Sequence, residues 1–155
     1  MNIDTGTNEL LCSVRDGVAL ITLNRPEALN ALSMDIRHGL LNAMDRFADD
    51  NNVRCIVITG AGEKAFCAGA DLQATNAFTT DYSEPAGHVA QVLRAAKASN
   101  LPLIARVNGH CLAGGMGLLS MCDMAVAAPH ALFGLPEVKV GVFPAQVLSV
   151  LQHLI

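Results

Sequence analysis

Two apolar runs, each followed by a glycine-bearing turn, constrain the fold of this chain more than any other feature. Cys55–Ile58 is continuously apolar rather than alternating, and Leu101–Val107 is the second run. Such runs indicate strands buried on both faces, which occur mainly in parallel sheets covered by helices. Together with the helical segments between and after them, they predict an α/β fold with parallel strand pairing.

Turn and capping residues predict the remaining elements. Asp16–Gly17 separates two β-branched runs within Leu10–Leu23, which predicts an opening β-hairpin. Ser33 is placed to cap a helix whose apolar residues follow at helical spacing. Between Gly60 and Pro85 no period is sustained, which predicts a long functional loop. We also expect helices over residues 88–98, 114–121 and 145–155, and a strand over residues 124–128.

Composition favours a single domain that binds a small molecule or another protein. The 155 residues are 52% hydrophobic and 15% charged, enough for one core spanning residues 1–155. The net charge of -4 provides no basic stripe of the kind that nucleic acid or an anionic membrane surface requires. Neither a secretory signal nor an apolar run of membrane-spanning length is recognisable, so we expect a cytoplasmic protein with no membrane or nucleic-acid partner.

The five cysteines are scattered along the chain and form no C-x-x-C pair. They lie in apolar or glycine-rich surroundings, which favours buried, reduced thiols over disulfides. No metal site is expected from this spacing.

The first candidate site is the segment Lys64–Leu72. Gly69 permits an unusual backbone direction there, and the small alanines let a ligand approach the main chain. Backbone N–H groups in such a turn can point together at an anion. The alternative is an ordinary turn at the end of a strand, with Asp71 capping a helix.

The second candidate site is the segment Val107–Gly117, where glycines open an expected helix. The free N–H groups of a helix start can hold developing negative charge. Alternatively, the glycines only let two backbones pack closely. Two such turns, each leaving a buried strand, are what is needed to supply two convergent N–H donors to one carbonyl oxygen, which is an oxyanion hole.

These segments resemble a known family. Phe66–Leu72 and Val107–Asp123 are similar to the two signature segments of the crotonase, or enoyl-CoA hydratase/isomerase, superfamily, and Asn24–Leu32 and Phe133–Glu137 match further motifs in the family's order. The resemblance implies a crotonase-like (ClpP/crotonase) ββα spiral core. It covers the front part of the family pattern, so we expect a single truncated core domain, residues 1–155, lacking the C-terminal helical part.

The resemblance also implies a substrate and a site. The N–H groups of Ala70 and Gly114 are expected to hold the thioester carbonyl of an acyl-CoA, with no cofactor beyond this CoA substrate. The residues expected along the CoA moiety are Arg25, Ala28, Lys64, Ala68, Gly69, Asp71 and Leu72. Among these, Lys64 and Arg25 are candidates for contact with the CoA phosphates. Family members are usually trimers or pairs of trimers, so a homo-oligomer is expected.

Glu137 and Gly117 bear on the reaction. Hydratases that this chain resembles hold water between two glutamates; here Glu137 matches the second, whereas Gly117 occupies the first position. Moving a double bond from the β,γ to the α,β position needs only one carboxylate that removes an α-proton and returns it to the γ-carbon. The resemblance therefore favours a Δ3-Δ2-enoyl-CoA isomerase with Glu137 as its catalytic base. An enoyl-CoA hydratase is the alternative.

Two further readings remain open. Gly60–Ala65 fits the dinucleotide fingerprint G-x-G-x-x-A, with Asp81 or Glu84 at a later acidic position, although no long helical pattern starts within the motif. The other alternative is a non-catalytic remnant, scaffold or acyl-CoA-binding module.

Overall fold

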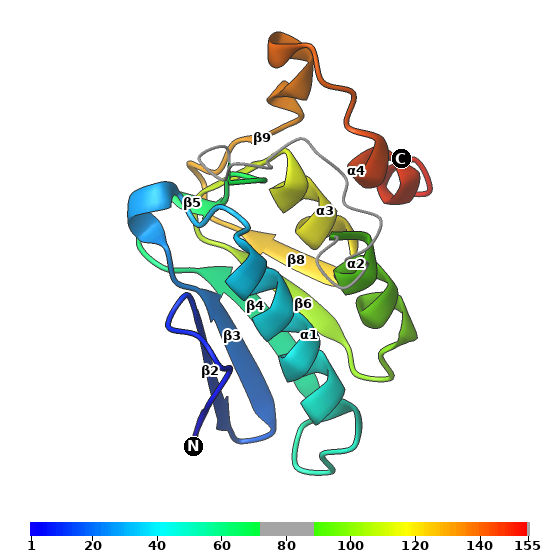
Figure 1. The fold of residues 1–155 in the computed structure, drawn as a ribbon. Coiled ribbons are helices and arrows are strands. Elements are labelled where there is room, and N and C mark those ends of the chain that lie inside the picture. Colours follow the sequence, from blue (N-terminus) through cyan, green and yellow to red (C-terminus); the bar gives the residue numbers. More distant parts are fainter. Residues whose placement is uncertain (72–88, 155) are drawn as a thin grey trace.

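The structure, a computed structural model, describes residues 1–71 and 89–154. Within them a six-stranded sheet has the order β1-β2-β3-β4-β6-β8, and a three-stranded sheet has the order β5-β7-β9 (Figure 1). The strands are β1 (Asn2–Ile3), β2 (Leu10–Arg15), β3 (Val18–Leu23), β4 (Cys55–Gly60), β5 (Ala65–Cys67), β6 (Leu103–Val107), β7 (His110–Leu112), β8 (Met124–Ala127) and β9 (Phe133–Gly134). The helices are η1 (Pro26–Ala28), α1 (Met34–Ala48), α2 (Val89–Ala98), α3 (Gly114–Ser120), η3 (Pro136–Val140) and α4 (Ala145–Leu151).

The large sheet combines an antiparallel start with a parallel remainder. The strands β1, β2 and β3 pair antiparallel, and the pairs β3–β4, β4–β6 and β6–β8 are parallel. The hairpin between β2 and β3 turns through Asp16 and Gly17, both with positive φ, 52° and 82°. Two such residues match the right-handed twist of the flanking strands. The predicted hairpin and the predicted parallel pairing are therefore confirmed.

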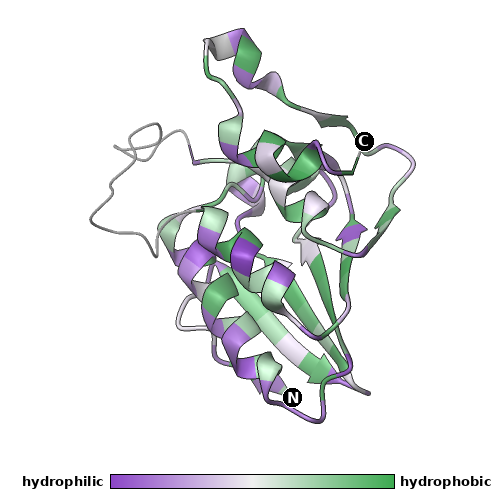
Figure 2. Ribbon diagram, turned by 90° about the vertical axis from the view of Figure 1, so that its right-hand side faces the viewer, coloured by the Kyte–Doolittle hydropathy of each residue, from purple (hydrophilic) through white to green (hydrophobic). Residues whose placement is uncertain are grey.

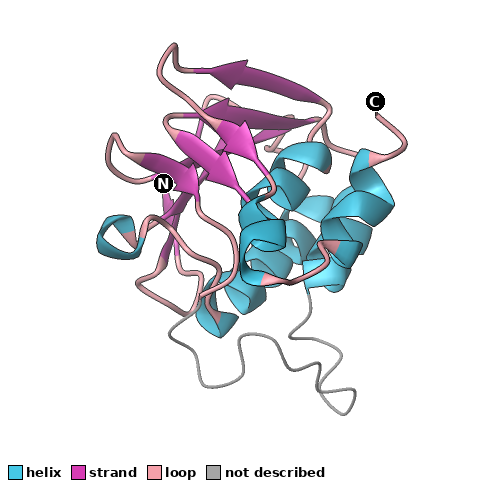
Figure 3. Ribbon diagram, turned by 90° about the horizontal axis from the view of Figure 1, so that it is seen from above, coloured by secondary structure: helices cyan, strands magenta, loops and turns pink. Residues whose placement is uncertain are grey.

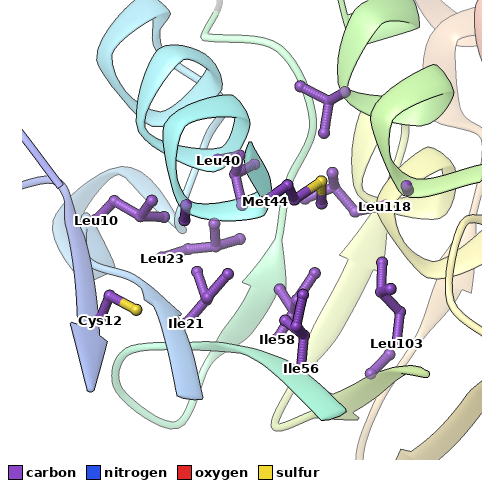
Figure 4. Close-up of a cluster of buried hydrophobic side chains, with 14 of the residues drawn as sticks. Leu10, Cys12, Ile21, Leu23, Leu40, Met44, Ile56, Ile58, Leu103 and Leu118 are labelled. Carbon is purple, nitrogen blue, oxygen red and sulfur yellow. The ribbon is translucent and has the colours of Figure 1, made fainter. Parts of the chain in front are cut away.

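The α-helices gather on one side of the strands, as the view from above shows (Figure 3). Ser33 caps α1, since its hydroxyl oxygen accepts a hydrogen bond from the N–H of Ile36 at 3.1 Å, as predicted. In Figure 4, Leu40 and Met44 of α1 point toward the sheet residues Leu23 and Ile58. All four side chains are at most 5% exposed.

Hydropathy follows this layering. The strands are mostly green in Figure 2, whereas the helices carry purple and green segments side by side. No helix within residues 1–71 and 89–154 is long and apolar enough to cross a bilayer.

Some predicted elements were wrong in their extent. The segment after Gly60 was expected to be a loop, yet it contains β5, and β7 lies in what was expected to be a glycine-rich turn. Both strands have three residues, too few for a period to show in the sequence. The last helix ends at Leu151 rather than at residue 155.

Candidate functional site: two convergent backbone turns

The small sheet brings the two predicted turns together. β5 and β7 are parallel neighbours, with Cys67 opposite Cys111, so the turns that follow them leave the same edge. A Cβ built on Gly69 would lie 2.9 Å from the nitrogen of Gly114, and one built on Gly114 would lie 3.7 Å from the nitrogen of Ala70. The two amide groups named from the sequence are therefore close neighbours in space.

Both amides are free to bind a ligand. Within the described residues, the N–H groups of Ala70 and Gly114 donate to no acceptor. Gly114 is the first residue of α3, where N–H groups have no partner inside the helix. Gly69, with φ +99°, sets the backbone direction just before Ala70. Two adjacent unpaired donors are the arrangement that an oxyanion requires.

Backbone hydrogen bonds and one ion pair hold the turn around Gly69 and Ala70. The N–H of Leu32 donates to the carbonyl of Gly69 at 2.7 Å, and the N–H of Ala68 donates to the carbonyl of Leu29 at 3.0 Å. Next to Ala70, the carboxylate of Asp71 lies 2.7 Å from Nη1 of Arg25. The position of the Ala70 amide therefore depends on the segment around η1.

Arg25 is already engaged by carboxylates. Besides Asp71, its Nε lies 3.3 Å from Glu9, and Nη1 donates to the carbonyl of Ala31 at 3.2 Å. Burial alone lowers the pKa of Arg25, but the hydrogen bond from its guanidinium to Asp71 and the nearby carboxylates raise it above its ordinary value. The sequence pointed to Arg25 as a phosphate contact, whereas its guanidinium is here used to fix the first turn.

Two asparagines that the sequence analysis did not single out hold the turn before β5. The amide Nδ2 of Asn30 donates to the carbonyl oxygens of Ala61 at 3.0 Å and Ala65 at 2.8 Å. From the other side, Nδ2 of Asn108 donates to the carbonyls of Gly62 at 2.8 Å and Ala65 at 3.2 Å. Both asparagines lie in motifs quoted for the family resemblance, which was the signal that could have found them.

Glu137 follows the strand that borders the second turn. In β9, Gly134 lies opposite Leu112, and its carbonyl accepts the N–H of Ala113 at 3.0 Å. Three residues later Glu137 stands in η3, where its Oε2 is buried without a hydrogen-bond partner from the described residues. Buried polar atoms are nearly always hydrogen-bonded, so an unpaired carboxylate oxygen is a candidate for exchanging a proton with a ligand.

Gly117 lies one helical turn into α3 and is buried. A Cβ built there would lie 3.5 Å from Cγ2 of Val147 and 4.0 Å from Cδ2 of Leu93, both ordinary van der Waals separations. Crowding therefore does not explain why this position lacks a side chain.

The cysteines are free thiols, as predicted. Burial raises the pKa of Cys67, Cys111 and Cys122 to about 12 in each case. At neutral pH these thiols are protonated and poor nucleophiles. Among residues 1–71 and 89–154, no group of three or more His, Cys, Asp or Glu side chains could hold a metal ion.

The other predicted site residues are spread around the first turn. Ala28 ends η1 and is half-buried, as is Ala68, whereas Lys64 is exposed. Leu72, and the acidic positions 81 and 84 of the dinucleotide reading, lie outside the described residues. A strand, β5, begins at Ala65 instead of the long helix that a dinucleotide fingerprint needs, so that reading is wrong.

Comparisons with known proteins identify relatives of this chain. The family model described as enoyl-CoA hydratase/isomerase matches residues 13–155. The putative enoyl-CoA hydratase/isomerase YngF of Bacillus subtilis is 38% identical over 140 residues, which cover 90% of this chain and 54% of the relative. A short-chain-enoyl-CoA hydratase of Clostridium acetobutylicum is 36% identical, over 88% of this chain and 53% of that enzyme.

Solved structures give the same result. AtuE of Pseudomonas aeruginosa superposes with a TM-score of 0.85 at 35% identity, covering 94% of this chain and 58% of that chain. An enoyl-CoA hydratase from Bacillus anthracis superposes with a TM-score of 0.81 at 32% identity. The chain belongs to the enoyl-CoA hydratase/isomerase family and has its crotonase fold. It spans about half the length of the curated relatives that it matches.

Proposed function

We propose that the chain binds an acyl-CoA thioester, stabilises its enolate, and moves the double bond of a 3-enoyl-CoA to the 2-position. The observation that carries this proposal is the pair of adjacent, unpaired amides of Ala70 and Gly114. An enolate oxygen needs two such donors, and each one is typically worth roughly 3 kcal/mol or more in the transition state.

Glu137 is the proton carrier in this proposal. Its carboxylate removes a proton from the α-carbon, and the electron pair of that C–H bond passes into a dienolate whose oxygen accepts from Ala70 and Gly114. Returning the proton to the γ-carbon leaves the double bond between the α- and β-carbons. The unpaired Oε2 of Glu137 supports this role, since a proton carrier needs an oxygen free of other hydrogen bonds.

Hydration is the second candidate, because several relatives are named enoyl-CoA hydratases. Adding water requires one group to activate the water and a proton for the α-carbon, a task usually shared by two carboxylates. Gly117 stands where the family's first glutamate is expected, and the space around it admits a Cβ. The missing carboxylate is what favours isomerisation.

The CoA moiety is proposed to run past Arg25, Ala28, Ala68, Gly69, Asp71 and Leu72, with Lys64 as a phosphate contact. A homo-oligomer, a trimer or a pair of trimers, is the assembly we propose. Because the chain spans about half the length of its relatives, a module that binds acyl-CoA without turnover is the remaining alternative.

An assay of the purified chain with a 3-enoyl-CoA tests the proposal. We expect the 2-enoyl thioester to form, and the absorbance of its conjugated double bond measures the rate. Glu137→Gln should lower kcat at least 100-fold, in line with the ~10²–10⁴-fold contribution of a general base. Gly117→Glu should raise hydration relative to isomerisation. Binding without turnover would favour the non-catalytic module, and an unchanged product ratio in Gly117→Glu would contradict the single-carboxylate argument.

A further inference from the structure

The Ala70 amide stands at the end of a chain of hydrogen bonds that begins at a charged side chain. Nη1 of Arg25 donates to the carbonyl oxygen of Ala31 at 3.2 Å. That carbonyl shares a peptide unit with the N–H of Leu32, which donates to the carbonyl oxygen of Gly69 at 2.7 Å. The Gly69 carbonyl in turn shares a peptide unit with the N–H of Ala70. One cation therefore leads through two peptide units to the first amide of the site.

The peptide units of this chain fix the direction of the Ala70 N–H. Both units are trans, so the C=O and N–H groups of each point in opposite directions. Because the Gly69 carbonyl is held toward Leu32, the Ala70 N–H points away from Leu32. Within residues 1–71 and 89–154 this N–H donates to no acceptor. The bond to the Gly69 carbonyl therefore aims the amide as well as holding the turn.

A cation at the head of such a chain strengthens the donor at its end. Each hydrogen bond polarises the peptide group that it reaches, and the effect is larger where water is excluded. The side chain of Arg25 is 17% exposed, and Ala31 and Leu32 are 6% and 3% exposed. An arginine also stays protonated in a protein. The Ala70 N–H should therefore be a stronger donor than an isolated amide.

Two carboxylates hold the guanidinium of Arg25 at the head of the chain. Nη1 lies 2.7 Å from Oδ2 of Asp71, and Nε lies 3.3 Å from Oε1 of Glu9. Nη1 carries two hydrogens, so its bond to Asp71 does not compete with its bond to the Ala31 carbonyl. The other oxygen of Glu9 accepts a hydrogen bond from the hydroxyl of Ser33, the N-cap of α1. The guanidinium is thus fixed on three sides.

We propose that Arg25 is a positioning residue of the enolate site, which aims and polarises the Ala70 N–H through these two peptide units without touching the substrate oxygen. This role rests on the proposed binding of an acyl-CoA thioester. It also gives the two amides different support, since Gly114 starts α3 whereas Ala70 lies in no described helix. A contact between Arg25 and the CoA moiety would affect every CoA ligand alike, whereas this role affects only ligands that carry a thioester oxygen.

Calorimetry with two ligands that differ in the thioester oxygen tests this role. Butanoyl-CoA carries that oxygen, and S-butyl-CoA, the matching thioether, lacks it. We expect Arg25→Gln to weaken butanoyl-CoA binding about three- to tenfold, the range of one modest hydrogen bond, and to leave S-butyl-CoA binding unchanged. Arg25→Lys, which keeps the charge, should weaken butanoyl-CoA binding less. Both ligands report on the same folded molecules, so a partly unfolded variant does not change the ratio of the two affinities.

Infrared spectra of bound butanoyl-CoA, labelled with ¹³C at its carbonyl, give a second measurement. Hydrogen bonds to the thioester oxygen lower its stretching frequency, and we expect Arg25→Gln to reduce this lowering. With a 3-enoyl-CoA, the same variant should lower kcat about tenfold with little change in KM, a smaller loss than the ~10²–10³-fold that follows removal of a donor.

Ser33→Ala is the matched control. It removes the cap of α1 and the hydroxyl bonded to Glu9, and therefore costs stability, but it leaves the chain from Arg25 to Ala70 intact. Its affinity ratio and carbonyl frequency should equal those of the wild type. If Ser33→Ala changes the ratio as much as Arg25→Gln, or if Arg25→Gln weakens both ligands equally, the proposed role is overturned.

The same measurements separate this role from the proposed function. Calorimetry and infrared spectra need no turnover, so a chain that binds both ligands without isomerising a 3-enoyl-CoA still decides the role of Arg25. A wild-type chain that binds neither ligand refutes the proposed function and this role with it. A wild-type chain that binds both, with a ratio insensitive to Arg25→Gln, refutes the role alone.

Discussion

Replacing Gly69 by alanine should damage both amide turns at once. A Cβ at this position would lie 2.5 Å from Cβ of Ala113 and 2.9 Å from the nitrogen of Gly114. Strain from a side chain at φ +99° costs roughly 1–3 kcal/mol, and overpacking in a tight site costs about 1–3 kcal/mol more. Together we expect a loss of roughly 2–6 kcal/mol in the free energy of unfolding. Displacement of one amide should lower kcat about 10²–10³-fold.

Gly6→Ala is the matched control for this substitution. Gly6 has a positive φ of 79°, but a Cβ there would meet nothing within 4 Å. The control therefore carries backbone strain alone, roughly 1–2 kcal/mol, and should leave kcat unchanged. Urea unfolding and the 3-enoyl-CoA assay measure the two effects. If Gly69→Ala is no less stable than Gly6→Ala and retains its turnover, the inferred contact between the turns is wrong.

Three further predictions concern groups around the turns. Arg25→Gln removes the cation that two partly buried carboxylates share and should lower the free energy of unfolding by about 3 kcal/mol in urea titrations, whereas Arg15→Gln, at an ion pair more than 85% exposed, should change little. Asn30→Ala removes the hydrogen-bond partner of the Ala61 carbonyl and of the Arg25 N–H, and should cost roughly 2–4 kcal/mol by the same measurement; a loss below that of Arg15→Gln would contradict this role of Asn30. The raised pKa values of Cys67 and Cys111, about 12, mean that the unfolded chain releases thiol protons first, so stability should fall as pH rises from about 9 toward 12. Cys111→Ala should flatten that decline by up to about 1.4 kcal/mol per pH unit, and an unchanged slope would count against burial of this thiol.

Local chemistry explains which parts of the fold were predictable. Asp16–Gly17 is a strong hairpin signal because both residues tolerate positive φ, and Ser33 predicts a helix start because its hydroxyl satisfies a free N–H. The two turns were recognisable from their glycines, although an ordinary turn or close backbone packing would leave the same local pattern. The resemblance to the family pointed to Ala70 and Gly114, and the structure places Gly69 and Gly114 next to each other.

Long-range contacts explain what the sequence did not reveal. The partners Arg25 and Asp71 are 46 residues apart, so no local pattern links them, and neither was expected to pair with the other. In the sequence Asn30 looks like an ordinary turn residue. Only the fold shows that its amide donates to the carbonyl of Ala65, which is 35 residues away. The strand β7 is held by pairing with β5 on one side and β9 on the other. Its three residues are too few for a strand pattern to be recognised in the sequence.

A crystal structure of the chain with a bound acyl-CoA tests the central claim most directly. Two amides from separate turns should meet on one thioester oxygen, within about 3.1 Å of both the Ala70 and Gly114 nitrogens. A bound thioester whose oxygen lies beyond hydrogen-bond reach of either amide would contradict the account.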